Sequence, residues 1–237
     1  MHYLVPWSGG LDSTYLVYKL LKEGHNVTAV CFDMNPQVKS YQDVRQREAI
    51  SKIRKLFSED YSVRLEILTL YDEIDIRAFS TRNAFAFVQF PTIINAILYT
   101  LVPEHDYVAL GYVVGDDIMS WMNDIVHLFN AWKPFLRENE YTELVLPLAK
   151  MSKYHIYHSL PSEIRKYVTW CESEREVTHR GCGSCRSCLK MKSYIDGIEF
   201  EPQLDLSSIL SKEDRTTIPT NVKTRKRKNK NVGTRSQ

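Results

Sequence analysis

Hydrophobic positions in the first third of the chain alternate between the pattern of buried strands and that of amphipathic helices. Short apolar runs rich in β-branched residues predict strands at His2–Trp7, Asn26–Asp33 and Val63–Leu70. Apolar residues at helical spacing predict helices at Asp12–Glu23, with Gly24 as a stop signal, and at about Tyr41–Phe57. This order predicts an α/β fold, a parallel Rossmann-like sheet with right-handed crossovers and helices on both faces.

The pattern continues less regularly toward the C-terminus. It predicts strands at Tyr107–Val114 and Leu144–Leu148, and helices at Phe90–Leu101, Met119–Arg137, from the capping residue Ser152 to about Pro161, and Cys185–Ile195. A length of 237 residues suits one large domain with a small appendage. We therefore expect an α/β domain at 1–165, a cysteine-bearing segment with a closing helix at 166–211, and a tail at 212–237.

Charge separates this tail from the rest of the chain. From Lys212 onward nine lysines and arginines face two acids, although the whole chain sums to only +2. Few large apolar side chains occur there, so we expect disorder. Six of the eight residues Lys223–Lys230 are basic. The tail is then either a solubilising end or a site of weak, sequence-independent contact with nucleic acid.

Two patterns bear on location. No run reaches the ~20 apolar residues that a membrane span needs. The first residues also lack the pattern of a secretion signal. We expect a cytoplasmic protein without membrane contact. The sequence does not decide the oligomeric state, and a homodimer stays open.

The first predicted strand and helix are joined by Ser8, Gly9, Gly10, Leu11, Asp12, Ser13 and Thr14. Two glycines let backbone N–H groups approach phosphate oxygens, and the start of a helix attracts anions. Ser8, Ser13 and Thr14 would add hydroxyl donors, and Asp12 could face a magnesium ion on the phosphates. The simpler alternative is a glycine turn in which Asp12 or Ser13 caps the helix. The position between strand and helix favours nucleotide binding.

Ser-Gly-Gly-x-Asp-Ser resembles the signature of the PP-loop ATP-pyrophosphatases, whose fold is of the adenine nucleotide alpha hydrolase type. The resemblance implies that ATP and Mg²⁺ are used, with Asp12 and Ser13 in catalytic roles. It implies adenylation, in which a substrate oxygen attacks the α-phosphate, pyrophosphate leaves, and a nucleophile then displaces AMP. The Gly-Lys-Ser/Thr of Walker loops is absent, which argues against a kinase.

Four of the five cysteines cluster with the spacing C-x10-C-x2-C-x2-C, at Cys171, Cys182, Cys185 and Cys188. In a cytosolic protein such clustering favours a metal over disulfides. Gly181 and Gly183 would permit the tight backbone path of a metal knuckle. Four thiolates fit a closed tetrahedral Zn²⁺ site. An iron–sulfur cluster and unmetallated thiols remain the alternatives.

The loop and the cysteines together resemble the 7-cyano-7-deazaguanine synthase family, in islands between about residues 3 and 195. The islands are Val30–Asp33, Arg82-Asn83, Leu146–Leu148 with Lys150 and Lys153, and Val168–Cys171. The resemblance implies that Asp33 lies beside the nucleotide and that Arg82 and Asn83 lie near the active site, where Arg82 would be catalytic or bind substrate. A surface arginine is the alternative.

The chain departs from this family after the fourth predicted strand, where it has Gly115–Trp121. Asp116 and Asp117 are candidates for binding a deazaguanine edge, or one of them caps the next helix. The resemblance implies that 7-carboxy-7-deazaguanine is adenylated, that ammonia gives the amide, and that a second ATP dehydrates it to the nitrile. A tRNA thiolase, or a nucleotide-binding accessory protein of a modification or defence system, are the alternatives.

Overall fold

A computed structural model describes residues 1–33, 41–61, 64–71, 105–113, 115–116, 118–119, 122–132, 142–171, 173 and 181–198. All of them lie in the first of two compact units, residues 1–204 and 205–237. The expected helix at Phe90–Leu101 and the basic tail lie outside the described residues.

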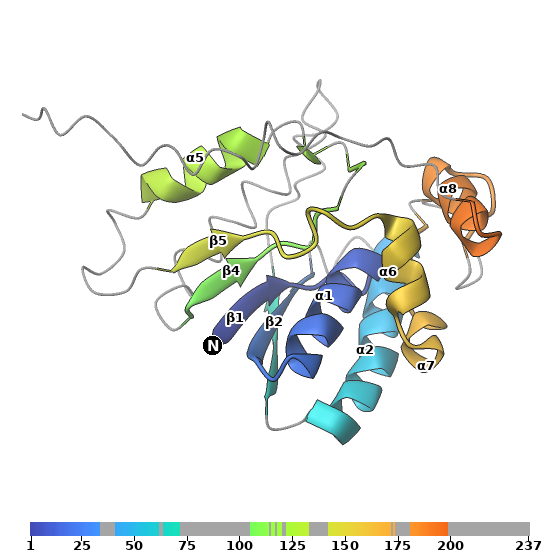
Figure 1. Ribbon diagram of the computed structural model, residues 1–237. Coiled ribbons are helices and arrows are strands. Elements are labelled where there is room, and N and C mark those ends of the chain that lie inside the picture. Colours follow the sequence, from blue (N-terminus) through green and yellow to red (C-terminus); the bar gives the residue numbers. More distant parts are fainter. Residues whose placement is uncertain are drawn as a thin grey trace, which may run out of the picture. The chain divides into compact units, whose positions relative to one another are not determined.

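Five parallel strands form one sheet in the order β3-β2-β1-β4-β5 (Figure 1). The strands are β1 His2–Pro6, β2 Asn26–Asp33, β3 Leu65–Tyr71, β4 Tyr107–Ala109 and β5 Glu143–Val145. The chain adds β2 and β3 on one side of β1 and then β4 and β5 on the other. The sheet order therefore reverses between β1 and β4, and ligands of open α/β sheets bind beyond the strand ends at such a point. The predicted parallel α/β fold is confirmed.

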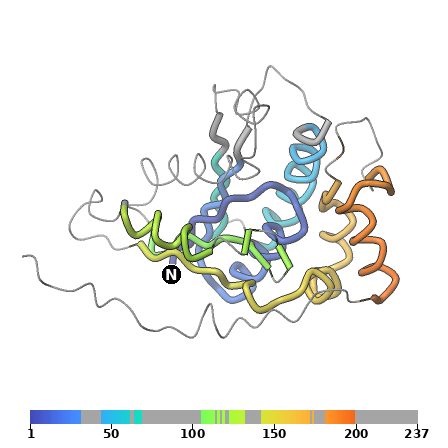
Figure 2. The backbone as a smooth tube through the Cα atoms, turned by 90° about the horizontal axis from the view of Figure 1, so that it is seen from above, coloured from blue at the N-terminus to red at the C-terminus, as the bar shows by residue number. Residues whose placement is uncertain are grey.

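The described helices are α1 Leu11–Lys22, α2 Tyr41–Tyr61, α5 Met122–Trp132, α6 Lys153–Ser159, α7 Ser162–Arg165 and α8 Arg186–Ile195. In Figure 1, α1, α2, α6 and α7 group together beside the sheet, while α5 lies apart from them, nearest to β5. Helix α8 packs beside α6, as Figures 1 and 2 both show. Apolar residues from the sheet and these helices form the core, among them the fully buried Val5, Val17 and Leu148.

Element boundaries agree with the sequence pattern in most places. Ser152 caps α6 as expected, since its Oγ accepts a hydrogen bond from the His155 N–H at 3.3 Å. The strand expected over Tyr107–Val114 ends at Ala109 instead. The next residues leave the sheet at Gly111, where a Cβ would lie 3.2 Å from the backbone of Ser13. The chain bends there because it passes directly against the start of α1.

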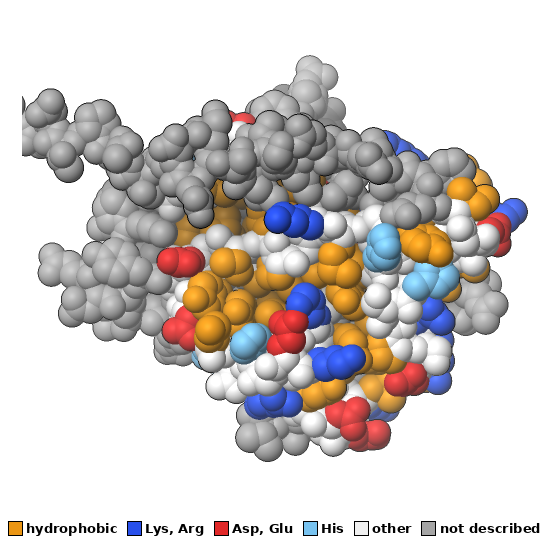
Figure 3. Space-filling view, in the orientation of Figure 1, with side chains coloured by type: hydrophobic (Ala, Val, Ile, Leu, Met, Phe, Trp, Pro, Cys, Tyr) orange, Lys and Arg blue, Asp and Glu red, His pale blue; other side chains and the backbone are white. Residues whose placement is uncertain are grey.

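Acidic and basic side chains are interspersed on the face that Figure 3 shows, without a broad region of one sign among the residues described there. No described helix combines the length and apolar character that crossing a bilayer requires.

Candidate functional site

The loop between β1 and α1 owes its shape to two glycines. Gly9 has a φ of +71°, and a Cβ there would lie 3.0 Å from the Gln46 carbonyl oxygen and 3.1 Å from Ala49 Cβ of α2. A side chain at this position would be strained by the positive φ and crowded by neighbours that would have to move by a few tenths of an ångström. Gly10 is the N-cap of α1, and no side chain caps the helix. The alternative in which Asp12 or Ser13 serves as the cap is therefore wrong.

Hydroxyl groups and amides converge on this loop. The Ser8 N–H donates to Ser13 Oγ at 3.3 Å, the two serine hydroxyls are 3.2 Å apart, and the Gly10 N–H donates to Ser8 Oγ at 3.3 Å. These hydrogen-bonded groups lie at the solvent-accessible surface, so an anion at the start of α1 can reach them. Leu11 is buried and lies next to them at the start of the helix.

Thr14 differs from the expectation that its hydroxyl faces a ligand. Its side chain is fully buried, and its Oγ1 accepts a hydrogen bond from Trp7 Nε1 at 3.0 Å. Trp7 itself is buried in the core. The hydroxyl thus satisfies the indole N–H, which would otherwise be a costly unpaired donor. Its position does not support a role in ligand binding.

A cluster of three charged side chains lies beside the loop. Lys153 Nζ, at the start of α6, is 3.1 Å from Asp12 Oδ2 and 2.8 Å from Asp116 Oδ1. The second oxygen of Asp116 accepts a hydrogen bond from the Val113 N–H at 3.1 Å. The sequence pattern did not assign Lys153 a role. The signal that could have indicated such a role is its position shortly after the Leu146–Leu148 segment, one of the islands of family resemblance.

In this cluster one carboxylate oxygen of Asp12 lacks a hydrogen-bond donor among the described residues. Burial by itself would lower the pKa of Lys153, but Asp12 and Asp116 outweigh burial and raise the pKa above its ordinary range, so the ammonium stays charged. Burial raises the pKa of Asp12, and Lys153 opposes that shift. Asp12 Oδ1 is buried and has no hydrogen-bond partner among the described residues. This oxygen is an acceptor open to a cation or a donor group.

The phosphate loop is connected directly to the cysteine segment. The Thr169 N–H donates to the Gly9 carbonyl at 3.1 Å, and Gly10 and Thr169 form a parallel bridge. Arg45 of α2 is buried and donates to the carbonyl of Cys171 at 3.2 Å and to that of Ser173. The first cysteine is therefore held in place by the phosphate loop itself and by α2, the helix that packs against Gly9 of that loop.

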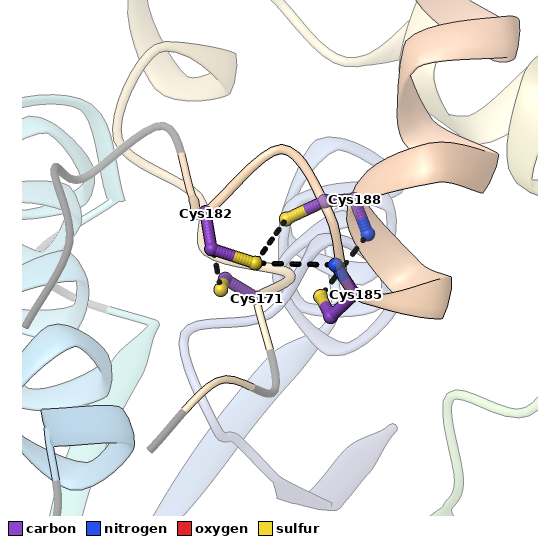
Figure 4. Close-up of side chains that lie close together, drawn as sticks. All are labelled: Cys171, Cys182, Cys185 and Cys188. Atoms are coloured by element: carbon purple, nitrogen blue, oxygen red, sulfur yellow. Dashed lines mark hydrogen bonds between the residues drawn. The ribbon is translucent and has the colours of Figure 1, made fainter. Parts of the chain in front are cut away.

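The four clustered cysteines meet at one point (Figure 4). The Sγ atoms of Cys171, Cys182, Cys185 and Cys188 all lie within 4.8 Å of one another. Cys171 and Cys188 are buried, and the other two are half-buried. These sulfurs could hold a metal ion. Cys31 lies elsewhere, buried in β2, and burial raises its pKa to about 12.

Hydrogen bonds around the cysteines favour a thiolate at Cys182, whereas burial raises the pKa of Cys188 to about 12. Amides donate to three of the sulfurs, including the Cys182 N–H to Cys171 Sγ at 3.4 Å and the Cys185 N–H to Cys182 Sγ at 3.2 Å. Hydrogen bonds from the side chain and backbone of Ser184 lower the pKa of Cys182 to about 5. Gly181 has a φ of +91°, and a Cβ there would lie 2.5 Å from Cys188 Sγ. The expectation that glycine permits this path is confirmed.

A cavity of about 190 Å³ lies between the phosphate loop and the cysteine segment. One side consists of Gly10, Leu11 and Asp12 with Lys153. The other side is formed by residues 169–171 and by α8, and Gln46 of α2 completes the lining. The phosphate loop and the cysteine segment thus share one concave site, the kind of place where small ligands usually bind.

Several expected site residues are placed only in part. Asp33 ends β2 at the carboxyl edge of the sheet, three residues beyond the last one that pairs with β1, but its side chain is not described. Arg82, Asn83 and Asp117 lie outside the described residues. The structure therefore brings together Ser8, Gly9, Gly10, Asp12 and Ser13, and it joins Asp116 to them through Lys153. Cys171 of the cysteine cluster lines the same cavity as Gly10 and Asp12.

The chain is similar to known proteins of the kind that its motifs indicated. No protein-family model matches the chain. The 7-cyano-7-deazaguanine synthase of Campylobacter jejuni is 25% identical over 224 residues, which cover 85% of this chain and 96% of that protein. The synthase of Saccharolobus solfataricus is 25% identical over 244 residues, again 85% of this chain, but the match spans only 47% of that longer relative.

Among solved structures, the U34-tRNA thiolase NcsA from Methanococcus maripaludis is similar to 70% of this chain, over 63% of its own length, at 18% identity and a TM-score of 0.41. The resemblance that the motifs indicated at isolated positions is confirmed, because the curated relatives match over most of the chain.

Proposed function

We propose that this chain is an ATP-using enzyme of the PP-loop class that adenylates the carboxylate of a deazaguanine-type acid and then aminates it. The observation that carries the proposal is the complete Ser-Gly-Gly-x-Asp-Ser loop at the point where the sheet order reverses, with Asp12 Oδ1, unpartnered among the described residues, beside the cavity. The similarity to two 7-cyano-7-deazaguanine synthases supports the choice of substrate.

The chemistry takes place in two stages. An oxygen of the acid attacks the α-phosphate of ATP, the bond from that phosphorus to pyrophosphate breaks, and pyrophosphate departs with the electron pair. Ammonia then adds to the carbonyl carbon of the acyl adenylate, loses a proton, and expels AMP to leave the amide. In the second stage the amide oxygen is adenylated in the same way. It leaves with AMP while the nitrogen loses its protons, which gives the nitrile.

The chain's own groups suit the first bond-breaking step. The Ser8 and Ser13 hydroxyls accept hydrogen bonds from the N–H groups of Gly10 and Ser8, and they can donate their own protons to the departing pyrophosphate and offset its growing charge. Lys153 carries a positive charge next to the same position.

Two metal ions fit the residues that are present. Asp12 Oδ1 is an oxygen ligand without a partner among the described residues, as Mg²⁺ requires, and Mg²⁺ bound there would neutralise phosphate charge. Four sulfurs at ~2.3 Å from one tetrahedral zinc ion stand ~3.8 Å apart. The cysteine sulfurs lie within 4.8 Å of one another, and the pair Cys182 and Cys188 is 4.0 Å apart. We propose a single structural Zn²⁺, since an iron–sulfur cluster needs wider spacing.

The test is the formation of the nitrile. Purified protein is incubated with ATP, Mg²⁺, ammonium and 7-carboxy-7-deazaguanine, and the product is identified by mass while pyrophosphate is measured. Asp12→Ala should keep its fold, judged by circular dichroism, and release pyrophosphate about 100-fold more slowly or worse, since one such contact contributes roughly 2.7–4 kcal/mol in a transition state. Wild-type turnover in Asp12→Ala would refute the assignment. A brown protein with iron absorbance would favour a thiolase instead.

A further inference from the structure

The cavity beside the phosphate loop has a second wall that phosphate binding leaves unexplained. This wall consists of Trp170, which precedes the first cysteine, and of Ser187, Lys190, Met191 and Tyr194 on α8. None of these residues belongs to the loop or to the sheet edge. They line the same cavity as Asp12 and Gly10.

The two lysines that line the cavity differ in whether acidic side chains neutralise them. Lys153 is engaged by both Asp12 and Asp116. Lys190 also lines the cavity, is exposed, and forms no ion pair with any residue that the structure describes. It is therefore a cation available to an anionic ligand that enters the cavity, and carboxylates and phosphates are the anions that an ammonium pairs with through charge-assisted hydrogen bonds.

The remaining lining suits a flat ring. The half-buried Trp170 packs against the core and also faces the cavity. Met191 and Tyr194 are buried and close the cavity on the same side. An aromatic face with an apolar floor binds planar heterocycles by stacking.

We propose that this second wall is the acceptor site: the ring of the acid to be adenylated lies against Trp170, and its carboxylate pairs with Lys190. The proposal rests on the function proposed above and assigns the substrate-binding residues that the sequence did not indicate. The acid and the phosphate loop would then meet across the cavity, which is the arrangement that attack on the α-phosphate needs.

The cysteine centre acquires a second role under this proposal. Cys185 is the N-cap of α8 and Cys188 lies in its first turn, two residues before Lys190. Metal ligation would therefore fix the start of the helix that carries the acceptor-binding lysine. This explains why the cysteine segment adjoins the phosphate loop rather than a remote surface.

The chain offers a matched pair of lysines for the test. Lys190 and Lys192 are both on α8, but they project about 200° apart around the helix, and Lys192 does not line the cavity. In Lys190→Gln the KM for 7-carboxy-7-deazaguanine should rise about tenfold or more, as loss of a charge-assisted hydrogen bond predicts. The KM for ATP should stay unchanged, and Lys192→Gln should behave as wild type. Turnover of the neutral amide should be insensitive to Lys190→Gln, because the amide carries no charge.

Equilibrium binding separates failure of this proposal from failure of the proposed function. Calorimetry with a non-hydrolysable ATP analogue and the same acid measures the acceptor Kd without turnover. If wild type binds the acid but releases no pyrophosphate, the proposed function fails, and a weaker Kd in Lys190→Gln alone still supports the acceptor site. The site is refuted if wild type binds no acid, if both lysine variants bind alike, or if Lys190→Gln raises the KM for ATP instead.

Discussion

Replacing Gly181 by alanine should disrupt the cysteine centre, whereas the same change at Gly183 should not. Both glycines have positive φ, +91° and +71°, so alanine costs roughly 1–2 kcal/mol at either site. Only at residue 181 does the new Cβ collide with a ligand, since it would lie 2.5 Å from Cys188 Sγ. At residue 183 a Cβ meets no described atom within 4 Å. The difference between the two variants therefore isolates the collision.

The size of the effect follows from the distances. Nonbonded heavy atoms rest about 3.5–4.0 Å apart, so the Cβ and the sulfur must separate by about 1 Å. Metal sites tolerate only about 0.2 Å in their ligand distances. Gly181→Ala should therefore bind well under half of the wild-type metal. For a chain of this length each 1 kcal/mol shifts Tm by about 2–4 °C, so Gly183→Ala should melt roughly 2–8 °C below wild type and Gly181→Ala clearly lower.

The assay is metal content by mass spectrometry of the purified variants, together with thermal melting with and without added zinc. Full metal content in Gly181→Ala, with a Tm equal to that of Gly183→Ala, would contradict the close approach of residue 181 to the Cys188 sulfur.

Three further outcomes are expected. Lys153→Met leaves Asp12 and Asp116 without their shared cation, so the free energy of unfolding in urea should fall by roughly 1–3 kcal/mol, a range already discounted for partial exposure. Adding Asp116→Asn to this variant should recover part of the loss. An unchanged free energy of unfolding would show that solvent screens the cluster. Cys185→Ser should lower metal content and Tm before it lowers turnover, and unchanged metal content would remove this residue from the ligands. If the tail contacts nucleic acid, deletion of residues 215–237 should remove a weak, salt-sensitive binding of RNA or DNA and leave turnover intact, whereas lost turnover would tie the tail to the active site.

Local patterns in the sequence determined much of the architecture. Asn26–Asp33 forms a strand with the expected bounds, because a β-branched run between two turn signals specifies a buried strand by itself. The phosphate loop and the cysteine cluster are equally local, since each depends on a few residue types at fixed spacing. Ser152 was readable as a cap for the same reason.

Contacts between distant segments were decided only by the tertiary structure. Lys153 meets Asp12 and Asp116 because three separate connections converge at the reversal of the sheet order, and no local pattern encodes that meeting. Thr14 carries the same residue type as a phosphate-binding hydroxyl, yet it points into the core to satisfy Trp7. The cavity wall of Trp170 and Lys190 likewise exists only because the backbone of Thr169 pairs with Gly9 and Gly10, which brings the cysteine segment against a loop about 160 residues earlier in the chain.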